Sequence, residues 1–175
     1  QSVGGMFTPD YWNYSMFKTI SENAGKEVSP GTLSILTDPG HLLLKYFPTE
    51  YHSDWQWWSI TRNSRPMILN ATRGEYRPLI QVIDNIERNH KLGLVFEFAV
   101  GKGKLLVCMT DLQAIAGTPE GNQFRTSLLR YMKSDAFHPI EQLAWKELDA
   151  LFHTDINQRQ IIGVKNESDY TVGGD

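Results

Sequence analysis

The chain has 175 residues, of which 41% are hydrophobic and 21% charged, and its formal net charge is −3. These totals are ordinary for a globular domain that buries a core. They include no basic stripe of the kind that nucleic-acid binding needs, and no apolar run approaches the roughly 20 residues that cross a bilayer. We therefore predict no nucleic-acid partner and no membrane span.

The chain predicts one domain over residues 1–153, followed by a polar C-terminal tail or edge strand over residues 154–175. The only cysteine is Cys108, so no intrachain disulfide can form. Because the sequence starts at Gln1 without methionine or a signal sequence, we expect its natural N-terminus to have been removed. Both ends are compatible with a piece cut from a longer polypeptide.

The first elements are a helix and a short strand. Thr8, Pro9 and Asp10 have the order of a helix start, with an N-cap, a proline at the first helical position and an acid in the first turn. A polar break over residues 23–31 follows, then a strand over residues 33–36. The composition of residues 38–40 predicts a turn.

Three of the five tryptophans lie in the next segment, residues 47–58. If residues 54–58 form a helix, Trp55 lies beside Trp58 at the i, i+3 spacing and Trp57 points elsewhere. If they form a strand, Trp55 and Trp57 share a face and Trp58 opposes them. In neither case can all three tryptophans line one pocket.

This segment is the first candidate site, because aromatic residues with polar edges suit both stacking and hydrogen bonding. Its candidate residues for carbohydrate binding or for an interface are Tyr51, His52, Asp54, Trp55, Trp57 and Trp58. The plain alternative is that most of the tryptophans are core or interface anchors. Glu50 and Asp54 could form a paired acid and base, but carboxylates this close in sequence are common, and we expect Asp54 to cap a helix or bond an indole.

Three strands follow, over residues 78–84, 92–100 and 104–110, and Gly101-Lys-Gly103 predicts a hairpin between the last two. Leu94, Phe96, Phe98 and Val100 are expected on one face of the sheet, with Val95, Glu97 and Ala99 on the other. Leu105, Val107 and Met109 should likewise oppose Leu106 and Cys108. Since both faces are largely apolar, helices should cover the sheet on both sides.

Two further features of this region are candidate sites. Asp84 and Asn85 open a polar loop after a buried strand, where open α/β sheets bind ligands, although Asx-type turn chemistry explains both residues. Cys108 lies within an apolar strand and is expected to be buried and inert. The histidines lack the spacing of a metal site, so we predict no metal and no cofactor.

The last predicted elements are helices. Thr118 and Pro119 repeat the helix-start signal, and the apolar stripe ends near Ser134. Pro139 is expected to begin another helix. The side chains of this helix that should point toward the core are Leu143, Leu148, Leu151 and Phe152. Ile161 to Val164 is the only later apolar cluster and would form an edge strand.

Four runs carry a resemblance to a known family: GMFTPDYWNYSMF, PTEYHSDWQWW, PLIQVIDNIERNHKLGLVFEFAVGKGKLLVCMTDL and FRTSLLRYMKSDAF. They resemble a C-terminal region of large bacterial glycoside hydrolases of the family 2, β-galactosidase-like type. The order of elements also resembles the class I glutamine amidotransferase-like, flavodoxin-like fold. A complete domain of that fold needs parallel strands upstream of Gln1, so the expected domain is a truncated one.

The resemblance implies a non-catalytic accessory module of a polysaccharide-degrading enzyme, acting by packing, oligomerisation or shaping the active-site rim. The catalytic carboxylates of such enzymes lie in a separate barrel of about 250 residues, so no catalytic residue is expected here. It further implies a periplasmic or cell-surface location and the parent's catalytic domain as partner, with carbohydrate or a second copy as further candidates. The alternatives are a carbohydrate-binding module that uses the tryptophans, and a small hydrolase or amidase that uses Cys108.

Overall fold

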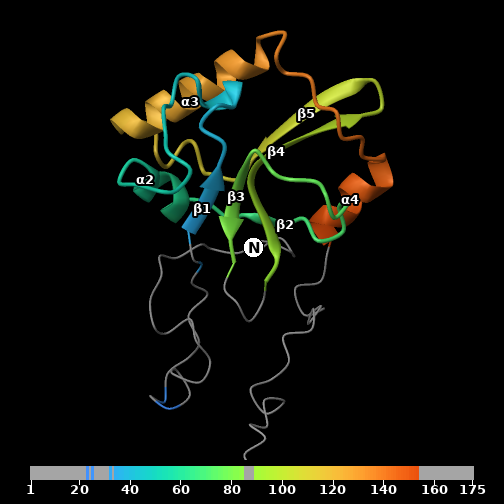
Figure 1. Ribbon diagram of the computed structural model, residues 1–175, viewed down its shortest axis with the longest axis horizontal. Coiled ribbons are helices and arrows are strands. Elements are labelled where there is room, and N and C mark those ends of the chain that lie inside the picture. The colour runs from blue at the N-terminus through green and yellow to red at the C-terminus, as the bar shows by residue number, and fades with distance from the viewer. Residues whose placement is uncertain (1–22, 24, 26–31, 33, 85–88, 154–175) are drawn as a thin grey trace, which may run out of the picture.

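The structure is a computed structural model, and it describes residues 23, 25, 32, 34–84 and 89–153 (Figure 1). Its elements within these residues are, in chain order, β1 (Ser34–Thr37), the 3-10 helix η2 (Leu42–Leu44), α2 (Trp57–Arg62), β2 (Met67–Ile68), β3 (Ile80–Ile83), β4 (Lys91–Val100), β5 (Gly103–Cys108), α3 (Pro119–Met132) and α4 (Trp145–His153). The helix predicted after Thr8, the break at 23–31 and the edge strand predicted at Ile161 to Val164 lie wholly or mostly outside the described residues.

The strands form one five-stranded sheet in the order β1-β3-β4-β2, with β5 also paired to β4. Gly93 pairs with β3 on one side and β2 on the other, and Val95 pairs with β3 and with β5. The strands β2 and β5 therefore follow one another along the same edge of β4. All four strand pairings are antiparallel. The mixed α/β class is confirmed, whereas the flavodoxin-like layering, which needs parallel strands, is not.

Helices cover both faces of the sheet, as the apolar strands predicted (Figure 1). One core joins the sheet to η2, α2 and α3, and it includes Leu43, Trp57 and Phe124. The second core lies on the other face, where Leu148 and Leu151 of α4 pack with Phe96 and Phe98 of β4. The long central strand β4 thus contributes to two separate cores.

A β-bulge in β4 changes which face its residues point to. Ile80 pairs with Val95 while the next residue of β3, Gln81, pairs with Gly93, so Leu94 is the extra residue. A bulge interrupts the strict alternation of side chains. Leu94 consequently packs with Val95 in the first core, and Phe96 lies in the second. The expectation that Leu94 shares a face with Phe96 is wrong for this reason.

The predicted hairpin between β4 and β5 is present. Val100 pairs with Gly103, leaving the two-residue loop Gly101-Lys102. Gly101 has a φ of +58°, which suits the first loop position of a type II′ turn. Leu105 and Val107 contact the second core, and Leu106 and Cys108 contact the first, so the predicted alternation in this strand is confirmed.

One of the two predicted C-terminal helices begins where expected. The Thr118 hydroxyl accepts a hydrogen bond from Gly121 N, and α3 starts at Pro119. The helix expected at Pro139 is wrong, because α4 begins only at Trp145. Before it, the chain runs along the free edge of β4, where Ala99 N donates to Glu141 O and Leu143 N donates to Ala99 O.

The hydrogen-bonding needs of that strand edge explain the late helix start, since a buried strand leaves few backbone groups unpaired. Leu143 still reaches the core, as predicted, but from this extended segment. Phe152 is 38% exposed on α4, contrary to the prediction.

Candidate functional site

The tryptophan segment forms a turn followed by α2, and Trp57 is its anchor. The Trp57 side chain is fully buried, and its indole N–H donates to the Thr49 hydroxyl at 2.7 Å. Its ring meets Phe47 and Phe124 edge to face, with centroid separations of 5.0 and 5.7 Å. Trp57 therefore belongs to the core and is closed to any ligand.

Trp55 and Trp58 are the two tryptophans that reach the surface. Trp55 is 86% exposed and Trp58 is 39% exposed. Their ring centroids lie 6.2 Å apart with the planes tilted by 49°. The Arg62 guanidinium lies 5.1 Å from the Trp58 ring centroid, within cation–π range. This is the arrangement that the helical interpretation of residues 54–58 predicted.

The preceding loop holds this pair in place through short-range hydrogen bonds. Asp54 Oδ1 accepts a hydrogen bond from Gln56 N at 3.0 Å, which makes an Asx turn at the helix entrance. Gln56 Nε2 donates to Pro48 O at 2.8 Å. The prediction that Asp54 caps the helix or bonds an indole is wrong, because Gln56 is the N-cap of α2 and the Trp57 indole bonds Thr49. Asp54 instead stabilises the turn that precedes the helix, and no hydrogen bond joins it to the exposed Glu50 carboxylate.

Tyr51 and His52 lie on the same loop and are exposed, Tyr51 by 67%. Their neighbours tie the loop to the sheet edge: Thr37 Oγ1 donates to Glu50 O at 2.6 Å, and Thr37 N donates to Tyr51 O at 3.4 Å. The exposed polar and aromatic side chains at this corner are therefore Tyr51, His52, Asp54, Trp55, Trp58 and Arg62, and we refer to them as the Trp55 surface.

The second predicted site, at Asp84 and Asn85, has a different character. Asp84 is buried and its Oδ2 accepts a hydrogen bond from His90 N at 3.0 Å. Asn70 completes the cluster, bonding the His90 ring at 2.9 Å and accepting from Lys91 N at 2.8 Å. Asn85 lies outside the described residues. These bonds satisfy backbone and side-chain groups at the base of the β3–β4 hairpin, so a structural role explains Asp84.

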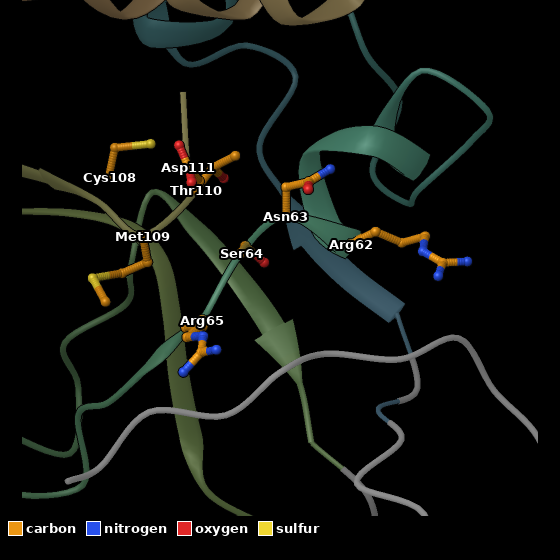
Figure 2. Close-up of a pocket in the computed structure, with 8 residues that line it drawn as sticks. All are labelled: Arg62, Asn63, Ser64, Arg65, Cys108, Met109, Thr110 and Asp111. Carbon is orange, nitrogen blue, oxygen red and sulfur yellow. The ribbon is translucent and has the colours of Figure 1, made fainter. Parts of the chain in front are cut away.

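Cys108 lines a cavity of about 520 Å³ between the end of α2 and the end of β5 (Figure 2). Burial raises the pKa of the Cys108 thiol, and this effect outweighs the opposing influence of the neighbouring Thr110. Figure 2 shows the guanidinium groups of Arg62 and Arg65 extending away from the thiol. A protonated thiol without a converging base is a poor nucleophile, so the cavity offers little to a cysteine hydrolase.

Sequence reasoning missed one polar cluster on the face covered by α3. Tyr131 Oη donates to Glu97 Oε2 at 2.9 Å, and the His41 ring packs edge to face on Tyr131 at 5.4 Å. Burial raises the pKa of the Glu97 carboxyl, opposed by the Tyr131 hydrogen bond and by the charge of His41. Only the polar Glu97 within an apolar strand signalled this cluster, and its partners come from distant segments.

Within the described part of the chain, no three His, Cys, Asp or Glu side chains gather where they could hold a metal ion. Nor does any helix described there have the length and apolarity needed to cross a membrane.

The structure therefore defines a mixed α/β domain with a double-sided core and an exposed tryptophan pair at one corner. The chain belongs to the family described as a domain of unknown function, DUF8487, whose model matches residues 1–153. No curated protein matches the chain.

Proposed function

We propose that this domain is a non-catalytic accessory module of a polysaccharide-degrading protein, and that its Trp55 surface binds carbohydrate. The observation that carries the proposal is the Trp55 indole, 86% exposed beside Trp58 on a well-anchored turn. The glycoside hydrolase parentage, the periplasmic or cell-surface location and the amidotransferase-like fold rest on the sequence resemblance alone and are part of the proposal.

The exposure of Trp55 runs against the usual behaviour of tryptophan. A large aromatic side chain in water forgoes the roughly 1.5–3 kcal/mol that burial of a large apolar side chain supplies. Here two rings on one turn stay at the surface while Trp57, between them, is fully buried. Because Trp57 is the tryptophan of this turn that packs into the core, Trp55 remains at the surface, where it can contact a ligand or partner.

The chemistry of the Trp55 surface suits a sugar ring. An indole offers a flat apolar face for the C–H face of a pyranose, and a polar edge for its hydroxyl groups. Arg62 stacks on Trp58, and this leaves Trp55 as the more accessible ring. Asp54 and His52 add hydrogen-bonding side chains on the same exposed loop.

The site is also held in place before binding. The Asp54–Gln56 and Gln56–Pro48 hydrogen bonds fix the turn, and Trp57 fixes α2 against Phe47 and Phe124. A preformed site loses less conformational entropy on binding, which favours recognition by a small surface.

The test is a titration with a panel of mono- and oligosaccharides, followed by tryptophan fluorescence. We expect a saturable change for at least one sugar in the wild type and its loss in Trp55→Ala. Trp145→Ala is the matched control, because Trp145 is also exposed, by 73%, but lies on α4. Absence of a saturable response to any sugar, or equal binding by Trp55→Ala, would refute carbohydrate recognition at this surface.

A second candidate function is packing of the Trp55 surface against the catalytic domain of a parent protein. The Trp58–Arg62 stack supports it, because tryptophan, tyrosine and arginine are enriched at the centres of protein interfaces. In that case the titration gives no sugar response, while Trp55→Ala weakens association with the partner domain in a pull-down of the two separately expressed parts.

A further inference from the structure

The outer edge of β5 has the backbone groups of a strand that still needs a partner. In a two-residue hairpin the residues that flank the loop exchange both hydrogen bonds, so Val100 and Gly103 face one another. The alternation continues to Met109, whose N donates to Leu94 O at 2.8 Å. Gly103, Leu105 and Val107 therefore face β4. The N–H and C=O groups of Lys104, Leu106 and Cys108 face outward and have no backbone partner among the described residues.

Several other edge groups of the sheet form hydrogen bonds with other parts of the chain. Tyr76 Oη donates to Glu97 O at 2.9 Å and accepts from Glu97 N at 3.2 Å, which satisfies the edge of β4 just beyond the first residue of β3. Farther along β4, Ala99 N donates to Glu141 O and Ala99 O accepts from Leu143 N. At β1, Thr37 N bonds Tyr51 O. The outer edge of β5, in contrast, has three outward-facing residues, Lys104, Leu106 and Cys108, for which the described part of the chain supplies no backbone partner.

The side chains of β5 also favour pairing. Leu105, Leu106, Val107 and Cys108 are all only half-buried. A lysine often guards an exposed edge strand against association, but Lys104 Nζ donates to Phe137 O at 2.8 Å and lies near the Phe137 ring. The charge of Lys104 thus lies against the protein's own surface. It does not oppose association of another strand with the apolar edge of β5.

We propose that β5 pairs antiparallel with β5 of a second copy of this chain, across a two-fold axis at Leu106. In this register Leu106 faces Leu106 of the second copy, and Lys104 faces Cys108. All three outward residues then exchange backbone hydrogen bonds, and two five-stranded sheets become one.

The charges at the two ends of β5 favour a second copy of this chain as the partner of this strand. One end of β5 is followed by Asp111 and the other is preceded by Lys102, and both side chains are exposed. In this register Lys102 of each copy faces Thr110 of the other, one residue from Asp111, so a cationic and an anionic side chain lie near each other at both ends. A two-fold interface must be self-complementary in this way.

The first experiment measures the mass of the 175-residue chain by light scattering over a wide range of concentration. We expect a species of twice the 20.0 kDa of one chain, favoured at high concentration. Leu106→Pro removes the outward N–H but no bond to β4, so it should shift the chain to the monomer. Leu106→Ala keeps the N–H and is the control, which should still dimerise.

A second experiment tests the register without relying on a proline variant. Lys104→Cys places a thiol opposite Cys108 of the other copy, within the Cα distance that a disulfide spans. The two positions lie four residues apart on one strand and cannot bridge within a chain, since that spacing is roughly 13 Å. Mild oxidation should therefore give a covalent dimer on a non-reducing gel.

Lys146→Cys, on the exposed side of α4, is the matched control and should not cross-link. A wild type that stays monomeric at every concentration would overturn the proposal, and the β5 edge would then be open to an extended segment of another protein. A dimer that survives Leu106→Pro, in a chain whose Lys104→Cys variant fails to cross-link, would place the interface elsewhere and would overturn it equally.

Discussion

At the scale of single residues, the tryptophan segment separates a structural role from a binding role within three positions. Trp57 is fully buried among Phe47 and Phe124, and its indole N–H has a hydrogen-bond partner. We expect Trp57→Ala to lower the free energy of unfolding by about 3–5 kcal/mol, because it leaves a large cavity. Trp55→Ala should change it by about 0.5 kcal/mol or less.

Urea unfolding followed by far-ultraviolet circular dichroism measures both variants without relying on the tryptophans as probes. Trp57→Phe separates the two contributions of Trp57, because it keeps an aromatic ring in the core but removes the N–H group that donates to Thr49. Equal destabilisation by Trp55→Ala and Trp57→Ala would contradict the division of roles.

Glu97 predicts a pH dependence of stability. Because burial raises the pKa of its carboxyl, the folded chain holds this proton to higher pH than the unfolded chain, whose glutamate titrates near about 4.3. The folded state therefore binds more protons, and the contribution of Glu97 to stability falls as the pH rises through the folded-state pKa. Glu97→Gln removes this titration while keeping an acceptor for Tyr131.

We expect the unfolding free energy of Glu97→Gln, minus that of the wild type, to increase with pH from about 4.3 upward and then to level off. Chemical unfolding at a series of pH values measures the difference. Glu75→Gln serves as the control for loss of a surface carboxylate, because the Glu75 side chain is 91% exposed. A flat difference for Glu97→Gln would contradict the burial of this carboxyl.

At the scale of elements, helix propensity and packing have opposite effects on a substitution of Gly121 in the first turn of α3. Replacing a glycine inside a helix with alanine usually stabilises it by about 1 kcal/mol. At Gly121, however, a Cβ would lie 2.2 Å from Ile115 O and 2.8 Å from the Thr118 hydroxyl that caps the helix. Ile115 O is a backbone atom and cannot move without moving the chain before the helix.

We therefore expect Gly121→Ala to lower the melting temperature, with a net loss of about 1–3 kcal/mol. Asn122→Ala, at the exposed neighbouring position, should leave stability unchanged or raise it slightly. Differential scanning calorimetry measures the melting temperature of both variants. A higher melting temperature for Gly121→Ala would show that helix propensity outweighs the steric conflict.

The elements that the sequence predicted well are those whose signals are local. Thr118 and Pro119 mark the start of α3, and Gly101 marks the hairpin turn. The errors come from long-range pairing. No local pattern shows that β3 slips against β4 and turns Leu94 to the other core, or that Ala99 recruits residues 141–143 and delays α4.

The same distinction holds for the candidate site. Helical spacing alone brought Trp55 beside Trp58, and this needed no tertiary information. Which tryptophan would be buried depended on Phe47 and Phe124, the latter 67 positions beyond Trp57, so the sequence left it open. The cluster of Glu97, Tyr131 and His41 likewise combines three distant segments, and its only local signal was a polar Glu97 within an apolar strand.

At the scale of the whole molecule, the two proposals make a joint prediction. A dimer through β5 carries two Trp55 surfaces, so a polysaccharide chain or coated surface can engage both at once. Linked sites gain affinity without any new contact, by up to about 100-fold when the geometry permits simultaneous binding. A single short oligosaccharide fills one site and gains nothing from the second.

We therefore expect the wild type to bind an immobilised polysaccharide more tightly than Leu106→Pro, while both bind the soluble oligosaccharide equally in fluorescence titrations. Surface plasmon resonance at low and high ligand density measures the difference, which should grow with density. Trp55→Ala should abolish binding in both formats, because it removes the site itself. If the wild type and Leu106→Pro bind the dense surface equally although only the wild type dimerises, the two Trp55 surfaces do not engage one ligand together, and dimerisation serves another purpose.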